Sequence, residues 1–157
     1  MSRRRRAEKR KTEPDSLYGS VTLEKFINRV MMGGKKSTAR HIVYTAIENL
    51  ANKANIENPL EAFELALENA KPSLEVKSRR IGGATYQVPV EIASDRRTAL
   101  AMRWIILYAR NKVGRSMEAG LTSELLDCLN NQGATIKKKD ETHRMAESNK
   151  AFAHYKW

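Results

Sequence analysis

The sequence has a single cysteine and no long apolar run. Among its 157 residues Cys128 is the only cysteine, which excludes an intrachain disulfide and a multi-cysteine zinc site and fits a reducing compartment. No apolar stretch approaches the roughly 20 residues that span a bilayer, and the arginine-rich start is not followed by an apolar signal segment. We therefore expect a soluble protein that stays where it is made, with an inert, buried thiol on an apolar helical face.

Clusters of catalytic or metal-binding side chains are also missing. The three histidines, His41, His143 and His154, lie far apart, and the best combination, His143 with Glu147, offers only two ligands. We interpret that combination as a surface pair, and most of the acidic residues as solubilising partners of nearby lysines and arginines and not as paired acid/base carboxylates. The sequence predicts no enzyme, no cofactor and no metal site.

A glycine and lysine segment, Gly33 to Ser37, invites comparison with a phosphate loop. That motif needs another glycine five positions before the Gly-Lys pair, and Arg29 stands there inside a predicted helix. The comparison therefore fails for a nucleotide site. Lys35 and Lys36 still stand at a helix start, where free amides favour a phosphate. The alternative is a helix-helix turn with solvated lysines.

Positive charge is what the sequence has in excess. It contains 29 Lys and Arg against 18 Asp and Glu, with a formal charge of +11 and a pI near 10.0. A polyanion offsets such self-repulsion, so nucleic acid is the first candidate partner and an anionic membrane the second. Residues 1–18 form a basic arm, or alternatively a solubilising or targeting tail. Its cations are Arg3, Arg4, Arg5, Arg6, Lys9, Arg10 and Lys11.

Apolar residues recur at three- and four-residue steps through most of the chain, which predicts helices. The fold class is mainly α: a single domain of about six helices with one protruding β-hairpin, in which residues 19–157 form a helical RNA-binding domain. The first helix is expected to follow Ser20 and stop at Gly33-Gly34, the second to be capped by Ser37 or Thr38, and the third to start at Asn58 with Pro59 and end before Pro72. The fourth is expected from Ser94 or Asp95 to about Val113, the fifth from Ser116 to Gly133, and the sixth from about Thr135 to Asn149.

The hairpin, at about 73–92, turns at Gly82 and Gly83. A two-residue turn would put Leu74 and Val76 on the face opposite to Tyr86 and the other apolar residues of the second strand. A three-residue loop, Gly82 to Ala84, puts them all on one face, and we prefer that loop. A lone hairpin buries too little to stand free, so it folds back on the helices or reaches toward a partner.

Several separate elements offer cations to a polyanion. The hairpin contributes Lys77, Arg79 and Arg80. Arg96, Arg103 and Arg110 are spaced by seven, which predicts one narrow line along a helix. A last, largely polar helix contributes Lys137, Lys138, Lys139 and Arg144, supported by pairs such as Lys137 with Glu141. Together these elements favour RNA binding over isolated solvated patches.

The C-terminus interleaves aromatic and basic residues. Phe152, His154, Tyr155 and Trp157 stand among Lys150 and Lys156. Such aromatics stack on unpaired bases or pack against a protein neighbour, and the sequence leaves both open.

Three motifs resemble the bacterial-type small-subunit ribosomal protein S-seven family: the hairpin from Arg79 to Val90, the turn Gly34-Lys35-Lys36-Ser37, and the ending from His143 to Tyr155. The likeness runs essentially from Ser2 to Trp157. The four consecutive arginines of the arm depart from the family pattern.

The resemblance implies a cytoplasmic constituent of the small ribosomal subunit that binds the 3′ domain of its rRNA, nucleates head assembly, and lies near the exit-site tRNA and mRNA. It further implies contacts with the proteins numbered nine and eleven, and neither a membrane nor a homo-oligomer is expected. Lys35, Lys36, Arg96, Arg97, Arg103 and the arm from Arg3 would face rRNA. The hairpin tip, Arg79, Arg80, Ile81, Gly82, Gly83 and Ala84, would lie nearest tRNA and mRNA, and Lys150, Phe152, His154 and Tyr155 nearest a neighbouring protein.

Two rival functions are weighed against this interpretation. One is a DNA-binding helix-turn-helix around Met32 to Ser37, which a preference for duplex DNA over structured RNA would favour. The other is an enzyme acting on RNA, for which no acid/base or metal cluster is visible.

Overall fold

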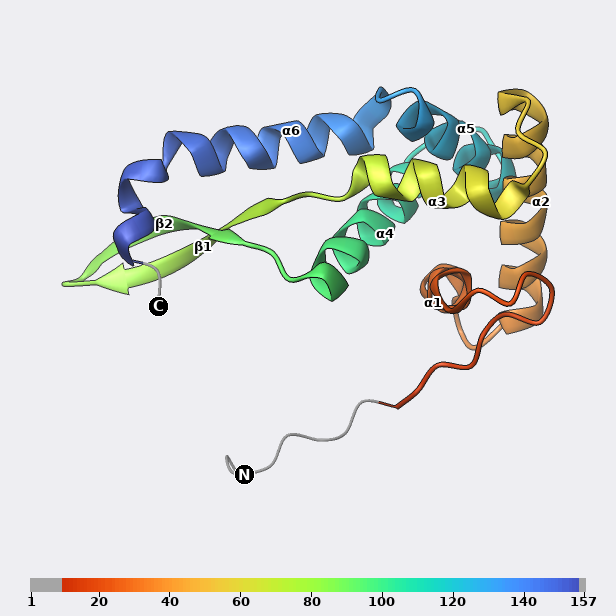
Figure 1. Ribbon diagram of the computed structural model, residues 1–157, viewed down its shortest axis with the longest axis horizontal. Coiled ribbons are helices and arrows are strands. Elements are labelled where there is room, and N and C mark those ends of the chain that lie inside the picture. The colour runs from red at the N-terminus through yellow and green to blue at the C-terminus, as the bar shows by residue number, and fades with distance from the viewer. Residues whose placement is uncertain (1–9, 156–157) are drawn as a thin grey trace.

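Six α-helices, one hairpin and a 3₁₀ turn make up the described part of the chain, residues 10–155 of a computed structural model (Figure 1). In chain order they are α1 Val21–Val30, α2 Lys36–Ala54, α3 Pro59–Ala70, β1 Leu74–Ile81, β2 Ala84–Glu91, α4 Ser94–Arg110, α5 Met117–Leu129, α6 Gly133–Ser148 and η1 Lys150–Tyr155. The mainly helical fold with one hairpin is confirmed. The predicted contacts Arg3, Arg4, Arg5 and Arg6 lie outside the described residues.

Three helices begin where a local side-chain cap predicts. Ser20 caps α1 by accepting the amide of Leu23, Asn58 caps α3, and Ser116 caps α5. Each cap satisfies an amide that has no partner within its helix. These starts depend only on neighbouring residues, and the predictions are confirmed.

Other predicted helix ends are wrong. Lys35, not Ser37 or Thr38, is the N-cap of α2, and it makes no side-chain cap hydrogen bond. Gly33 and Gly34 take φ of 58° and 75°, so the turn is tight enough for the helix to start at once. Gly133 opens α6 with φ of 89° and does not cap α5, whose C-cap is Asn130.

The fourth helix also starts and stops earlier than expected. Ala93 is its N-cap, in place of Ser94 or Asp95, and its carbonyl accepts the amides of Arg96 and Arg97 at 2.9 and 3.0 Å. Backbone groups thus supply the first hydrogen bonds without a capping side chain. The helix ends at Arg110, three residues before the expected Val113.

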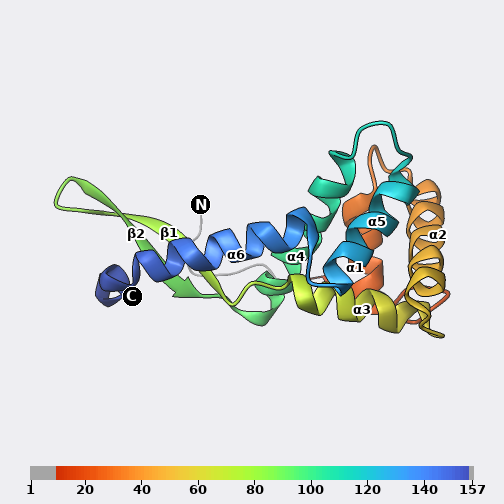
Figure 2. The same cartoon turned by 90° about the horizontal axis from the view of Figure 1, so that it is seen from above.

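The core lies mainly among the first five helices, and Ile136 of α6 packs into it. In it α5 packs against α2, α3, α4 and α6 (Figure 2). Leu121 and Leu125 on α5 are fully buried, and the rings of Phe26 and Phe63 pack with centroids 5.1 Å apart. Burial of this size holds the helix ends, and the cations on them, at fixed spacings.

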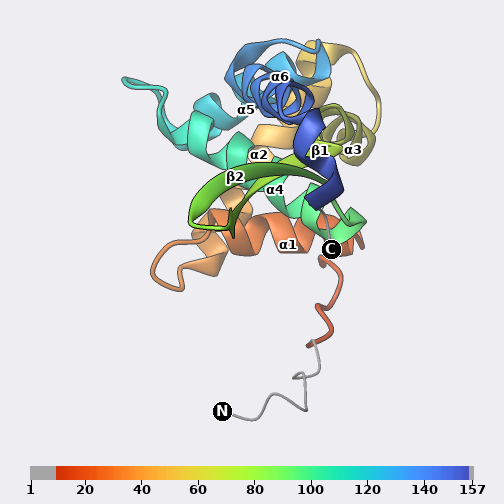
Figure 3. The same cartoon turned by 90° about the vertical axis from the view of Figure 1, so that its left-hand side faces the viewer.

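The hairpin and α6 extend together away from this core. Both strands contact α6, and η1 packs on β2 (Figure 1). Viewed from the hairpin end, α6 and α1 lie on opposite sides of the strands (Figure 3). The hairpin is therefore braced along one side by the C-terminal part of the chain.

The preferred three-residue hairpin loop is wrong. Ile81 pairs with Ala84, so the turn has two residues, Gly82 and Gly83, with φ of 54° and 87°. Two consecutive positive φ values match the twist of a tight hairpin, and both glycines accept them. The preference for one apolar face failed because adjacent residues of β2, Val88 and Pro89, are both buried, so both faces of the hairpin base contact protein.

Candidate nucleic-acid interface

Six cations gather along the segment before α1, α1 itself, the start of α2 and α4. They line three hollows in a row: the middle one shares Arg29 with the first and Arg110 with the third. We call the set the cationic tract, and its members are Arg10, Lys25, Arg29, Lys35, Arg103 and Arg110. Asp95 is the one carboxylate, within residues 10–155, that lines these hollows.

Two arginines of the tract tie α1 and α4 together. Arg29 Nη1 donates to the carbonyl of Ala99 at 3.2 Å, and Arg110 Nη2 donates to the carbonyl of Val30 at 3.2 Å. A guanidinium has five N–H donors, so each tie leaves further donors for a ligand. These two hydrogen bonds fix the width of the tract, because an arginine of each helix donates to a backbone carbonyl of the other helix.

Two other members of the tract, Lys25 and Arg103, do not tie helices together. Lys25 and Arg103 are exposed and make no ion pair or hydrogen bond within the described part of the chain. Lys35, also exposed, stands at the N-cap of α2, where helix amides lack partners. Solvated cations on fixed helices suit the phosphates of a nucleic-acid backbone, whose contacts are electrostatic and independent of sequence.

The seven-spaced arginines divide between two tasks. Arg103 and Arg110 belong to the tract, whereas Arg96 donates from Nε and Nη2 to Glu75 Oε2 at 3.2 and 3.1 Å. Arg97 donates to the carbonyl of Ile92 at 2.8 Å. These two contacts fasten the hairpin base to α4.

Lys36 is engaged inside the protein. It forms an ion pair with Glu24, whose residue exposure is only 4%, and Arg40 Nη2 lies 3.7 Å from the same carboxylate. The expectation that acidic residues face solvent is wrong for Glu24, because the α1–α2 packing buries it beside two cations. The helix-turn-helix alternative also loses a cation at the start of its second helix.

The hairpin cations lie at the far end of the molecule from α1 and α2 (Figure 1). Arg80 is exposed, Arg79 is half-buried, and Lys77 Nζ is 3.4 Å from Glu75. Ile81 is half-buried, and Gly82, Gly83 and Ala84 are exposed at the tip. The structure therefore presents two separate cationic surfaces on one body.

The lysine run of α6 is partly used within the protein. Lys139 donates to the carbonyl of Asn69 at 2.7 Å and so holds α6 to the end of α3. Lys138 pairs with Glu141 at 2.7 Å, so Glu141 takes Lys138 in place of the expected Lys137. That hydrogen bond lowers the pKa of Glu141. Lys137 and Arg144 are exposed on α6.

One of the C-terminal aromatics has an internal partner. The ring of Phe152 packs on that of Tyr86 with centroids 5.3 Å apart. Lys150 and His154 are exposed, and the side chain of Tyr155 lies outside the described residues. Phe152 thus joins η1 to the hairpin.

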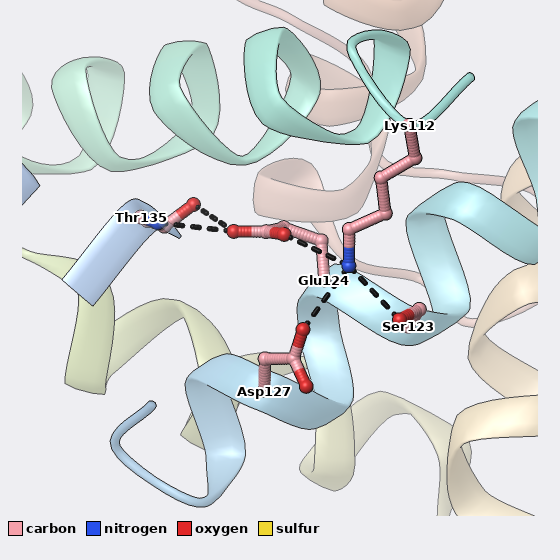
Figure 4. Close-up of polar contacts among 5 residues, drawn as sticks. All are labelled: Lys112, Ser123, Glu124, Asp127 and Thr135. Carbon is pink, nitrogen blue, oxygen red and sulfur yellow. Dashed lines mark hydrogen bonds and ion pairs between the residues drawn. The ribbon is translucent and has the colours of Figure 1, made fainter. Parts of the chain in front are cut away.

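A buried network that the sequence did not reveal joins the α4–α5 loop, α5 and α6 (Figure 4). Glu124 is fully buried, and its Oε1 accepts the amide and hydroxyl of Thr135 at 3.0 and 2.7 Å. Its Oε2 lies 3.0 Å from Lys112 Nζ, an ion pair by distance although the atom accepts no hydrogen bond. Lys112 also donates to Ser123 and Asp127 at 2.9 and 3.0 Å. The network fixes the start of α6.

The same burial explains the cysteine. Cys128 is buried, and burial together with the nearby Glu124 carboxylate raises its pKa to about 12. The predicted buried, inert thiol is confirmed. Among residues 10–155 no group of three potential metal ligands occurs, and no helix is long and apolar enough to cross a membrane.

Two further residues escaped the sequence analysis. Lys25 and Arg29 follow each other at four-residue spacing on the polar face of α1, a signal that the sequence contains beside the apolar face of the same helix.

The surface pair expected between His143 and Glu147 does not form: the ring nitrogen of His143 contacts Ser73, 70 residues away.

Comparison with known proteins adds an independent finding. Residues 2–150 match the family described as ribosomal protein S7p/S5e. The small ribosomal subunit protein uS7 of Protochlamydia amoebophila (strain UWE25) is 73% identical over 157 residues, the whole of both chains. Proteins with the same description from Chlamydia pneumoniae and Chlamydia felis (strain Fe/C-56) are each 69% identical, again over the full length of both chains.

Proposed function

The chain belongs to the ribosomal protein S7p/S5e family, and from this premise we propose that the cationic tract is where it binds small-subunit ribosomal RNA. Its full-length relatives are named small ribosomal subunit proteins, so the chain is a structural, non-enzymatic constituent of the bacterial-type small subunit and works in the cytoplasm as part of the ribosome. The finer proposal is that it binds the 3′ domain of the rRNA and nucleates assembly of the subunit head.

One observation supports the site: six cations from the arm and three helices line one continuous tract. RNA phosphates along the tract replace solvent around Lys25 and Arg103, while Arg29 and Arg110 keep the helices in place with part of their donors. Release of counterions drives the binding, and the fixed spacing selects RNA of matching shape. The chain thereby holds separate RNA segments in one orientation.

The remaining predicted cations belong to the same proposal as secondary contacts. Those with an internal partner, such as Lys36 and Lys139, are expected to contribute less than those without one. The full secondary set is Arg3, Arg4, Arg5, Arg6, Lys36, Lys77, Arg79, Arg80, Arg96, Arg97, Lys137, Lys138, Lys139 and Arg144.

The second cationic surface has a different proposed partner. We propose that the hairpin tip, Arg79 to Ala84, lies nearest the exit-site tRNA and the mRNA, and its projection away from the core supports this proposal (Figure 1). Lys150, Phe152, His154 and Tyr155 face the neighbouring proteins numbered nine and eleven. Since Phe152 also packs on Tyr86, this segment has an internal role as well.

Competition binding tests the proposal. The protein is titrated against a 3′-domain rRNA fragment, with a 5′-domain fragment of equal length and duplex DNA as competitors at one salt concentration. We expect the 3′-domain fragment to win, and chemical probing to show protection within it. Equal competition by the duplex would refute the assignment and favour the helix-turn-helix alternative.

Charge-matched variants test the tract itself. The double variant K25Q/R103Q removes two charges at positions that have no partner among residues 10–155, and K53E changes the net charge by the same amount on an exposed part of α2 away from the tract. We expect K25Q/R103Q to weaken rRNA binding about tenfold or more and K53E to leave it nearly unchanged. Equal losses would mean that only net charge matters.

A further inference from the structure

The base of the hairpin is closed by one residue, Ser73. Its carbonyl accepts the amide of Ile92, the residue after β2, at 3.2 Å. Its amide donates to Nε2 of His143 on α6 at 3.0 Å, and its hydroxyl lies 3.2 Å from the same nitrogen. Ser73 therefore links the two ends of the hairpin to α6 through a single histidine ring.

The direction of this hydrogen bond fixes the protonation state of the ring. A backbone N–H only donates, so Nε2 must offer its lone pair, and the ring must be neutral with its proton on Nδ1. A proton on Nε2 would face the proton of the Ser73 amide. The Ser73 hydroxyl can then accept from the protonated ring, but the amide loses its partner.

We infer that His143 is a titratable clasp: its neutral ring accepts the Ser73 amide and so holds the base of the hairpin against α6, and protonation of Nε2 breaks that hydrogen bond and loosens the base. The clasp itself is a property of the free protein. The effect of the clasp on contacts with tRNA and mRNA rests on the proposed function, because the clasp determines how rigidly the hairpin tip is held.

The other ties of the hairpin use no histidine. Glu75 pairs with Arg96. Tyr86 and Phe152 contact each other through their rings. His143 is thus the one histidine among these ties, and histidine is the side chain whose ordinary pKa lies between about pH 5 and 8.

Charged groups from every neighbouring element face this ring or its hollow. They are Lys139, Asp140 and Glu147 on α6, Glu91 on β2 and Lys150 at the start of η1. Burial lowers the pKa of His143 below its usual 6.5, Lys139 acts in the same direction, and Asp140 opposes them. The lowered pKa therefore favours the neutral ring, and with it the closed clasp, at pH 7.

The sign of the pH effect follows from that direction. A histidine whose pKa is lower in the folded state is protonated more readily when the clasp is open. The closed clasp is therefore favoured above the ordinary histidine pKa, and this preference is lost as the pH falls below it.

Amide hydrogen exchange in the free, full-length protein tests the clasp. We expect the Ser73 amide to lose about fivefold in protection between about pH 7.5 and pH 5, the change that loss of one ordinary hydrogen bond gives. Backbone ¹⁵N relaxation at Gly82 and Gly83 reports whether the tip becomes more mobile together with it.

Four variants separate the clasp from a general packing role. H143Q supplies an amide oxygen that accepts from Ser73 without titrating, so protection should be retained at both pH values. H143A should lack protection at both. S73A keeps the backbone amide, so it should retain the wild-type pH response, as should H41Q, which removes an exposed histidine on α2.

A flat wild-type profile would overturn the inference, and so would a wild-type response in H143A. Because all of these readouts come from the protein without RNA, they fail or succeed independently of the cationic tract. A negative result here together with tract-dependent rRNA binding would remove the clasp alone.

Discussion

Replacing Lys112 by methionine is the perturbation whose effect the structure defines most sharply. Methionine keeps most of the aliphatic stem but removes the ammonium group that lies 3.0 Å from Glu124 and donates to Ser123 and Asp127. Glu124 then keeps only the hydrogen bonds from Thr135 and stays fully buried as an unpaired carboxylate.

The expected cost can be worked out from burial. Removing one partner of a buried ion pair costs about 3–5 kcal/mol. The side chains of Lys112 and Asp127 are 23% and 41% exposed, so water reaches one side of the network. We therefore expect K112M to lower the free energy of unfolding by about 3 kcal/mol, the low end of that range.

Urea unfolding followed by circular dichroism measures this change. With a urea dependence of about 2 kcal/mol per molar, the midpoint should fall by roughly 1.5 M. The control is K137M on the exposed side of α6, which should stay within about 0.5 kcal/mol of wild type. Adding E124Q to K112M removes the unpaired charge and should recover roughly 1–2 kcal/mol.

Equal midpoints for K112M and K137M would refute this reasoning. The reasoning would also be refuted if the free energy of unfolding of K112M/E124Q were lower than the sum of the two single-variant changes predicts. Either result would mean that Glu124 does not depend on Lys112 for its charge.

Three further outcomes are expected. K36M should lower the free energy of unfolding by about 1–2 kcal/mol through the loss of the pair with buried Glu24, and at constant salt it should weaken rRNA binding less than K25Q/R103Q does. Burial alone would favour the neutral acid of Asp15, but hydrogen bonds from Tyr44 and backbone amides lower its pKa. The contribution of Asp15 to stability is therefore present above the pKa of the unfolded state and is lost as the pH falls through the pKa of the folded state. D15N should flatten that part of the acid unfolding profile. Cys128, with a pKa of about 12, should react with iodoacetamide at about pH 8 only after unfolding.

Much of the fold was predictable because its signals are local. Ser20, Asn58 and Ser116 cap their helices through amides two or three residues away, so spacing alone was enough. Helix starts made by backbone geometry, as at Lys35, carry no such signature. The hairpin register required knowledge of what covers each face of Val88 and Pro89, which only the tertiary structure supplies.

The candidate site was predictable in kind but not in membership. Net charge and separate basic elements indicated a polyanion, yet the individual sequence positions did not distinguish Arg103, which is solvated, from Arg96, which pairs with Glu75. Lys36 and Lys139 were likewise expected to be available and have internal partners. Such pairings join residues far apart in the chain, and their choice depends on the packing of whole helices.

The salt dependence of rRNA binding tests the central claim most directly. A plot of log K against log salt should fall steeply for the wild-type protein, and K25Q/R103Q should reduce its slope by about 1.4–1.8, since each phosphate contact contributes roughly 0.7–0.9. K53E should leave the slope unchanged. A shallow wild-type plot, or the same slope in K25Q/R103Q, would contradict phosphate binding along the cationic tract.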